Sequence, residues 1–123
     1  MKRLIAIILV VTAVLLSACN SSSSVNVAEA KSIADLKGAK IAAQTGTFHA
    51  EAMKQIEGNT ADTNPEFSDM LTALKSGAID GYIAEEPTAL AVCPTDNTLD
   101  YLRLVNTTTG FTAPEKQTGV AIA

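Results

Sequence analysis

Apolar residues along most of this chain recur with two different periods, which predict strands and helices in turn. From residue 31 onward, short apolar runs predict strands at 40–44, 79–84 and 101–105. Weaker strand signals lie at 60–63 and 119–123. Helices are predicted at 47–56, from residue 64 or 68 up to Gly77, and at 87–93.

The second of these helices has the most regular pattern. Its apolar residues follow the spacing i, i+3, i+4 and i+7, which places them on one face: Phe67, Met70, Leu71 and Leu74. Strands that alternate with helices require crossover connections, which produce a mainly parallel sheet with helices on both faces. We therefore predict an α/β fold of three layers in a single domain.

The first quarter of the chain has a different character. Lys2 and Arg3 precede a continuous apolar run at 4–16, which is typical of a signal peptide and shorter than a comfortable bilayer span of about 20 residues. The run ends in Leu16-Ser17-Ala18-Cys19, which resembles the bacterial lipobox. Residues 1–18 are predicted to be a lipoprotein signal peptide and Cys19 the lipidated residue. The alternative is an ordinary secretory signal with an incidental cysteine.

A small, polar, serine-rich stretch follows Cys19, so residues 19–31 are predicted to form a lipidated flexible tether. The folded lobe is then expected at 32–123. This arrangement predicts an exported protein, anchored through lipid to the outer face of the bacterial cell membrane, or periplasmic.

Composition excludes several kinds of partner. The net charge of -4 argues against nucleic acid. Only Cys19 and Cys93 are present, so lipidation of the first leaves no intramolecular disulfide, and Cys93 is read as an apolar filler. A single histidine, His49, offers too few soft ligands for a metal site. We expect neither a metal nor a cofactor.

Two segments carry the candidate chemistry. One runs from a strand into a helix through Gly46 and Thr47, where backbone N–H groups without helical partners attract an anion. The other is a strand that ends in Glu85, whose carboxylate attracts an ammonium group. At the same edge of a parallel sheet, the pair would suit an amino-acid zwitterion.

At these residues the chain resembles family 3 of the bacterial extracellular solute-binding proteins, the amino-acid receptors of ABC importers. The matching text comprises Ile33-Ala34-Asp35-Leu36-Lys37-Gly38, Gln44-Thr45-Gly46-Thr47, Met70 through Tyr82, and Glu85 with Pro87. The resemblance implies a periplasmic-binding-protein-like (type 2) lobe, an amino acid as ligand and an ABC permease as partner.

The resemblance also implies roles for several of the site residues. Gly46, Thr47 and Phe48 would receive the ligand carboxylate through backbone N–H groups, with the hydroxyl of Thr47 added. Glu85 would receive the ammonium group. Beside the resemblance, we expect Gln44 to contact the ligand through its backbone carbonyl, and Phe48 and His49 to meet the ligand side chain.

Each assignment has a structural alternative. Thr47 is also a suitable helix N-cap, and Glu85 with its neighbour Glu86 is also typical of a solvated strand end. His49 at a helix start is more often simply solvated. We read two further residues as structural, Asp80 and Tyr82.

Relatives in family 3 have two lobes, and the sequence before residue 32 is too short to supply the first one. The resemblance therefore implies an incomplete clamp that binds amino acids weakly on its own. The alternative function is a membrane-tethered interaction module without solute capture. An enzyme is the third alternative and is not expected, since no acid–base pair appears beyond Glu85 and His49.

Overall fold

The computed structural model describes residues 25–104, 108–112 and 120–122. The predicted signal peptide, Cys19 and most of the tether lie outside these residues. No helix in the described part reaches the length and hydrophobicity that a bilayer span requires.

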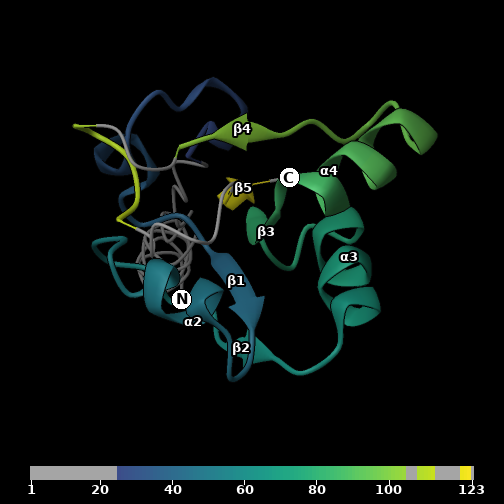
Figure 1. Ribbon diagram of the computed structural model, residues 1–123, viewed down its shortest axis with the longest axis horizontal. Coiled ribbons are helices and arrows are strands. Elements are labelled where there is room, and N and C mark those ends of the chain that lie inside the picture. The colour runs from purple at the N-terminus through teal and green to yellow at the C-terminus, as the bar shows by residue number, and fades with distance from the viewer. Residues whose placement is uncertain (1–24, 105–107, 113–119, 123) are drawn as a thin grey trace, which may run out of the picture.

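The strands form one five-stranded sheet in the order β2-β1-β3-β5-β4 (Figure 1). They span Ile41–Gln44 (β1), Thr63–Asn64 (β2), Gly81–Glu85 (β3), Leu102–Arg103 (β4) and Val120–Ile122 (β5). β1 runs parallel to β2 and β3, whereas β5 pairs antiparallel with both β3 and β4. Four strands therefore run in one direction and β5 in the other, which confirms the mainly parallel sheet.

Three α-helices connect these strands, at Phe48–Met53 (α2), Phe67–Lys75 (α3) and Glu86–Val92 (α4). α2 is shorter than the predicted helix at 47–56, because the chain after Met53 continues in tight turns with N–H groups bonded three residues back. α3 matches its prediction, and Gly77 beyond its end has φ +74°. Only glycine adopts this left-handed conformation without strain.

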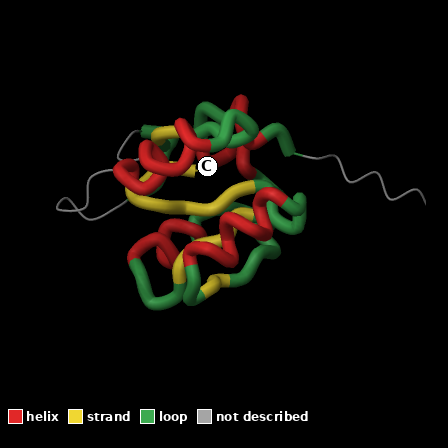
Figure 2. Tube along the Cα trace, turned by 90° about the vertical axis from the view of Figure 1, so that its right-hand side faces the viewer, coloured by secondary structure: helices red, strands yellow, loops and turns green. Residues whose placement is uncertain are grey.

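Alternate side chains of the strands enter two separate cores, as the period of two in a strand requires. One face of the sheet buries Ile41, Ala43 and Ile83 against α2, and the other buries Ala42, Tyr82 and Ala84 against α3. Figures 1 and 2 show helical segments on both sides of the strands. The predicted α/β fold of three layers is thus confirmed.

Two short 3₁₀ helices precede the sheet, η1 at Val27–Glu29 and η2 at Ile33–Leu36, and a third, η3 at Cys93–Thr95, follows α4. Ala30 is buried and belongs to the core on the α2 face. The folded part therefore begins within the segment predicted as tether, earlier than residue 32.

Residues read as structural from the sequence have structural contacts. The Asp80 carboxylate accepts a hydrogen bond of 2.8 Å from the backbone N–H of Lys40, which fixes the start of β1. Tyr82 is fully buried and packs edge-on against Phe67. Cys93 is partly buried, and burial raises the pKa of its thiol.

Candidate functional site

A cavity of about 470 Å³ lies at the carboxyl ends of β1 and β3. β1 and β3 are neighbours in the sheet, but the chain continues from them toward opposite edges. It goes from β1 to β2 at one edge and from β3 to β4 at the other. Ligands of open α/β sheets bind in the crevice where the connections diverge in this way. The cavity therefore occupies the place that the topology favours for a ligand.

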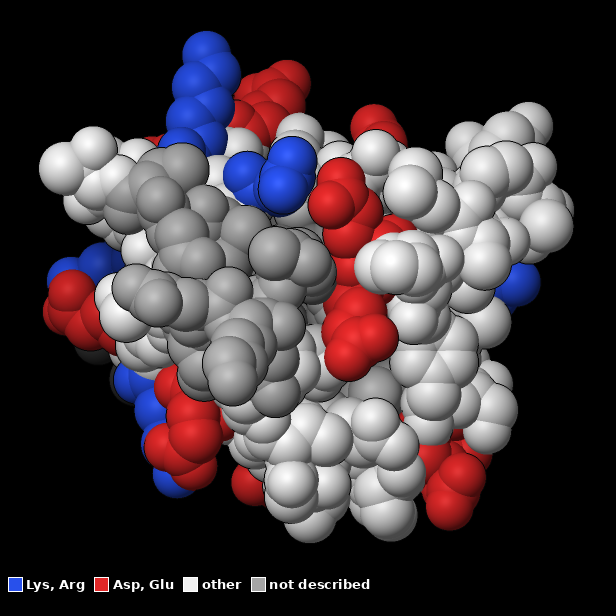
Figure 3. Space-filling view, in the orientation of Figure 1, with Lys and Arg blue, Asp and Glu red and all other residues white. Residues whose placement is uncertain are grey.

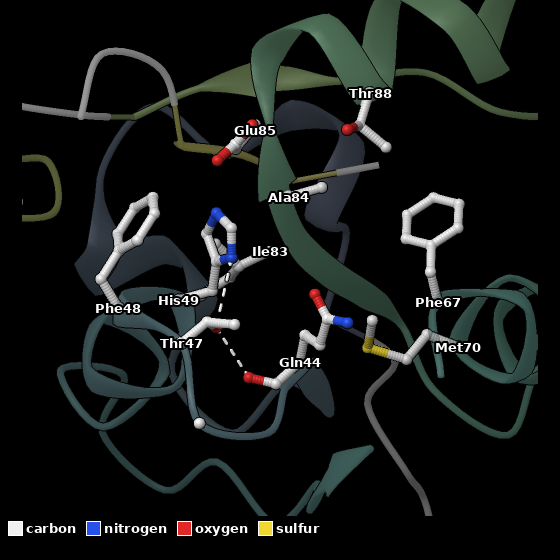
Figure 4. Close-up of a pocket in the computed structure, with 11 residues that line it drawn as sticks. Gln44, Thr47, Phe48, His49, Phe67, Met70, Ile83, Ala84, Glu85 and Thr88 are labelled. Carbon is white, nitrogen blue, oxygen red and sulfur yellow. Dashed lines mark hydrogen bonds between the residues drawn. The ribbon is translucent and has the colours of Figure 1, made fainter. Parts of the chain in front are cut away.

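All six predicted site residues line this cavity (Figure 4). They are Gln44, Gly46, Thr47, Phe48, His49 and Glu85. Gln44 is the last residue of β1, the next four lie in the turn and at the start of α2 that follow it, and Glu85 is the last residue of β3. Their placement around one space makes them available to a single small molecule, and their ligand contacts stay a prediction.

The turn after β1 lines the cavity and contains backbone N–H groups without partners in the described part of the chain. Gly46 has φ +75° and reverses the chain between β1 and α2. Within the described residues, no acceptor is found for the backbone N–H of Gly46, Thr47 or Phe48. These three donors are available to an anionic group, as the sequence predicts for them.

The Thr47 side chain differs from both sequence interpretations. It makes no capping bond to α2, and its hydroxyl instead donates to the backbone carbonyl of Gln44 at 2.7 Å. A hydroxyl has one hydrogen, so Thr47 cannot also donate to a ligand carboxylate. The Gln44 carbonyl oxygen accepts this bond with one of its two lone pairs, so the predicted ligand contact through that oxygen stays a prediction.

The expectation of a solvated His49 is wrong. Its side chain lies in the first turn of α2, is only 7% exposed and packs beside Phe48 with ring centroids 4.0 Å apart. Burial lowers the pKa of His49 below its usual 6.5, and the negative charge of Glu85 opposes that shift. The ring is therefore neutral at pH 7, with Nδ1 at 3.3 Å from the Thr47 hydroxyl oxygen.

Glu85 is exposed at the junction of β3 and α4. It occupies the N-cap position of α4, but its side chain does not cap that helix. The neighbouring Glu86 is engaged elsewhere, with a carboxylate oxygen 3.6 Å from Nε of Arg103.

Figure 3 shows acidic side chains gathered over this junction. No lining residue in the described part is Lys or Arg, so the cavity carries one negative charge.

Five further lining residues were missed by sequence reasoning, namely Phe67, Met70, Ile83, Ala84 and Thr88. Phe67 and Met70 come from the start of α3, which packs on the sheet through the core that Met70 shares with Ala42 of β1. Thr88 lies in the first turn of α4. Ile83 and Ala84 belong to β3 itself, directly before Glu85. The residues of α3 and α4 could have been found from the sequence, because both helices begin after the carboxyl end of a strand and therefore at the same sheet edge.

Metal chemistry has no cluster to support it in the described ranges, where no three His, Cys, Asp or Glu side chains gather in a way that could hold an ion. The cavity can act through hydrogen bonds, one carboxylate and apolar contact. It can bind a small polar molecule with a donor group on the Glu85 side and an acceptor group on the side of residues 46–48.

Comparison with known proteins gives one match. The family model DctP, described as bacterial extracellular solute-binding protein, family 7, matches residues 15–92, more than half of the chain. Neither the curated proteins nor the solved structures give a significant match. The resemblance to family 3 is therefore wrong as a family assignment, and the inference of an amino-acid ABC importer falls with it. The matched range contains all six predicted site residues.

Proposed function

Because the chain belongs to family 7 of the bacterial extracellular solute-binding proteins, we propose that its cavity binds a small solute for transfer to a membrane transporter. The family supports an exported protein and a transporter partner, which we propose to be of the TRAP type rather than an ABC permease. Lipid attachment through Cys19 stays a prediction, as does the absence of enzymatic activity.

The chemistry of the cavity narrows the class of solute. One side offers the N–H donors of Gly46, Thr47 and Phe48, which complement a carboxylate. The opposite side carries the Glu85 carboxylate, which complements a cationic nitrogen and repels a second anionic group. We propose a zwitterionic solute, such as an amino acid. A dicarboxylate would bring two negative charges to a described lining that contains no Lys or Arg and whose His49 is neutral.

A single observation carries this proposal: the donor turn after β1 and the carboxylate at the end of β3 line the same cavity at the point where the sheet connections diverge. We expect weak binding, with a Kd on the order of 1 mM. Glu85 is exposed, and charges in contact with water attract each other weakly.

The test is an NMR titration of the ¹⁵N-labelled protein with L-alanine, propionate and succinate. L-alanine should shift the amide resonances of Gly46, Thr47 and Phe48 and saturate at the lowest concentration. Propionate lacks the ammonium group and succinate carries a second carboxylate, so both should bind at least about tenfold more weakly.

Glu85→Gln should weaken binding of L-alanine by about two- to fivefold, because an ion pair with an exposed carboxylate contributes up to about 1 kcal/mol. Glu86→Gln is the matched control, since it removes the adjacent charge without altering the lining. Succinate binding more tightly than L-alanine would contradict the zwitterion. No shift at residues 46–48 with any of the three solutes would contradict the cavity as the site.

A further inference from the structure

His49 contains a polar atom that the fold leaves without a partner. Its Nε2 is buried and, among the described residues, makes no hydrogen bond. The ring lines the cavity, and in Figure 4 the nitrogen that is not bonded to Thr47 points toward Glu85. Buried polar atoms are nearly always satisfied, so one that faces a cavity indicates a missing partner from outside the chain.

The hydrogen-bond chain through Thr47 fixes the tautomer of this ring. The contact of 2.7 Å between the Thr47 hydroxyl and the Gln44 carbonyl requires the hydroxyl hydrogen to lie between the two oxygens. The hydroxyl therefore faces Nδ1 of His49 with a lone pair, at 3.3 Å, and Nδ1 must carry the hydrogen. In a neutral ring Nε2 is then a bare acceptor.

Two acceptors consequently face the same part of the cavity, Nε2 of His49 and the carboxylate of Glu85. They would repel each other unless a donor lies between them. We infer that His49 and Glu85 form one subsite for a nitrogen with at least two N–H hydrogens, so that a primary or secondary ammonium group is selected over tertiary and quaternary ones.

This inference rests on the proposed function and adds His49 as a residue that determines specificity. Glu85 alone would attract any cation, including a quaternary ammonium group without N–H. His49 adds a requirement for hydrogen-bond donors, since Nε2 gains nothing from a methyl group. Thr47 is a positioning residue, because it acts on the ligand only by fixing the tautomer of His49.

The first test needs no ligand. The chain contains a single histidine, so the untagged full chain labelled with ¹⁵N-histidine gives one imidazole signal set. At pH 7 the spectrum should show a protonated Nδ1 and a bare Nε2. Thr47→Val removes the hydroxyl oxygen that accepts from Nδ1 of His49, so the Nε2–H tautomer should become populated. Thr47→Ser keeps a hydroxyl at that place and should keep the wild-type spectrum. An imidazolium ion or an Nε2–H tautomer in the wild-type protein would overturn the inference.

The second test is a titration with glycine, sarcosine, N,N-dimethylglycine and glycine betaine, which differ stepwise in the number of N–H hydrogens. Glycine and sarcosine should bind alike, and the last two at least about tenfold more weakly. His49→Phe should abolish this step, and His49→Gln, whose amide oxygen can accept, should retain part of it.

The outcomes separate the two proposals. If His49→Phe binds the four ligands with the same relative affinities as the wild-type protein, the His49 subsite is overturned and the zwitterion proposal stands. Failure of glycine and sarcosine to bind the wild-type protein would overturn the zwitterion proposal and the ammonium subsite together.

Discussion

Two buried side-chain polar atoms lack a hydrogen-bond partner within the described residues, and their surroundings differ. Nε2 of His49 faces a cavity, whereas the hydroxyl of Tyr82 is enclosed in the core between the sheet and α3. Burial raises the pKa of Tyr82 to about 12, because the charged phenolate loses more hydration free energy in that core than the neutral phenol does. The His49 atom indicates a ligand contact, and the Tyr82 atom indicates only a cost to stability.

Tyr82→Phe is therefore expected to leave the free energy of unfolding unchanged or to raise it by about 1 kcal/mol, since it removes an unsatisfied buried hydroxyl. The edge-on contact with Phe67, with ring centroids 5.2 Å apart, is retained. Urea denaturation of both proteins measures the difference. A decrease of more than about 1 kcal/mol would show that the hydroxyl has a partner.

At the scale of elements, the turn between β1 and α2 performs two tasks. It reverses the chain through the left-handed Gly46, and its residues 46–48 line the cavity and carry N–H groups without an acceptor among the described residues. Gly77 has nearly the same φ at the end of α3, and neither glycine has an atom within 4 Å of the position that a Cβ would occupy. The two glycines thus share a conformational requirement, and only Gly46 lines the site.

Gly46→Ala and Gly77→Ala should each lower the free energy of unfolding by about 1–2 kcal/mol, the cost of a left-handed non-glycine residue. Only Gly46→Ala should also weaken binding of L-alanine, because its methyl group lies beside the N–H donors. Denaturation and NMR titration measure the two effects separately. Equal binding by both variants would contradict the role of the turn at residues 46–48.

At the scale of the whole molecule, the buried His49 makes stability depend on pH. The unfolded chain binds a proton at this ring near pH 6.5, whereas the folded protein holds the pKa lower. Since the unfolded state then binds more protons, the stabilising contribution is present above pH 6.5 and is lost as the pH falls below it. The pKa of Asp35 is also lowered, mainly by the backbone N–H of Lys31. Asp35 affects the pH dependence of stability only below its usual pKa of 3.8, because its carboxylate stays ionised above that pH.

Urea denaturation between about pH 7.5 and pH 5 should consequently show a free energy of unfolding that decreases toward acid pH. His49→Gln should flatten this dependence, because glutamine does not titrate. The same slope in both proteins would show that His49 remains as protonated in the folded state as in the unfolded chain.

Local periodicity was sufficient to predict the elements with strong patterns. The i, i+3, i+4, i+7 series from Phe67 to Leu74 predicted α3. Burial of this apolar face stabilises an amphipathic helix enough to offset the loss of conformational entropy. The apolar runs predicted β1 and β3, and alternation of strands and helices predicted the parallel sheet. These features depend on neighbours in sequence, so the sequence by itself determined them, together with the grouping of Gln44, Gly46, Thr47, Phe48, His49 and Glu85 at one sheet edge.

Only the tertiary structure decided how the polar atoms of that edge are used. His49 is buried beside the Phe48 ring, and the Thr47 hydroxyl donates to Gln44 rather than to α2. Phe67 and Thr88 reach the cavity from helices that follow other strands. The choice of hydrogen-bond partner depends on side-chain conformations that the packing of whole elements selects, even where the partner is as near in sequence as Gln44 is to Thr47. The period of the side chains along a helix or strand carries no information about those conformations. That is why the residue types of the site were predictable and the direction of each hydrogen bond was not.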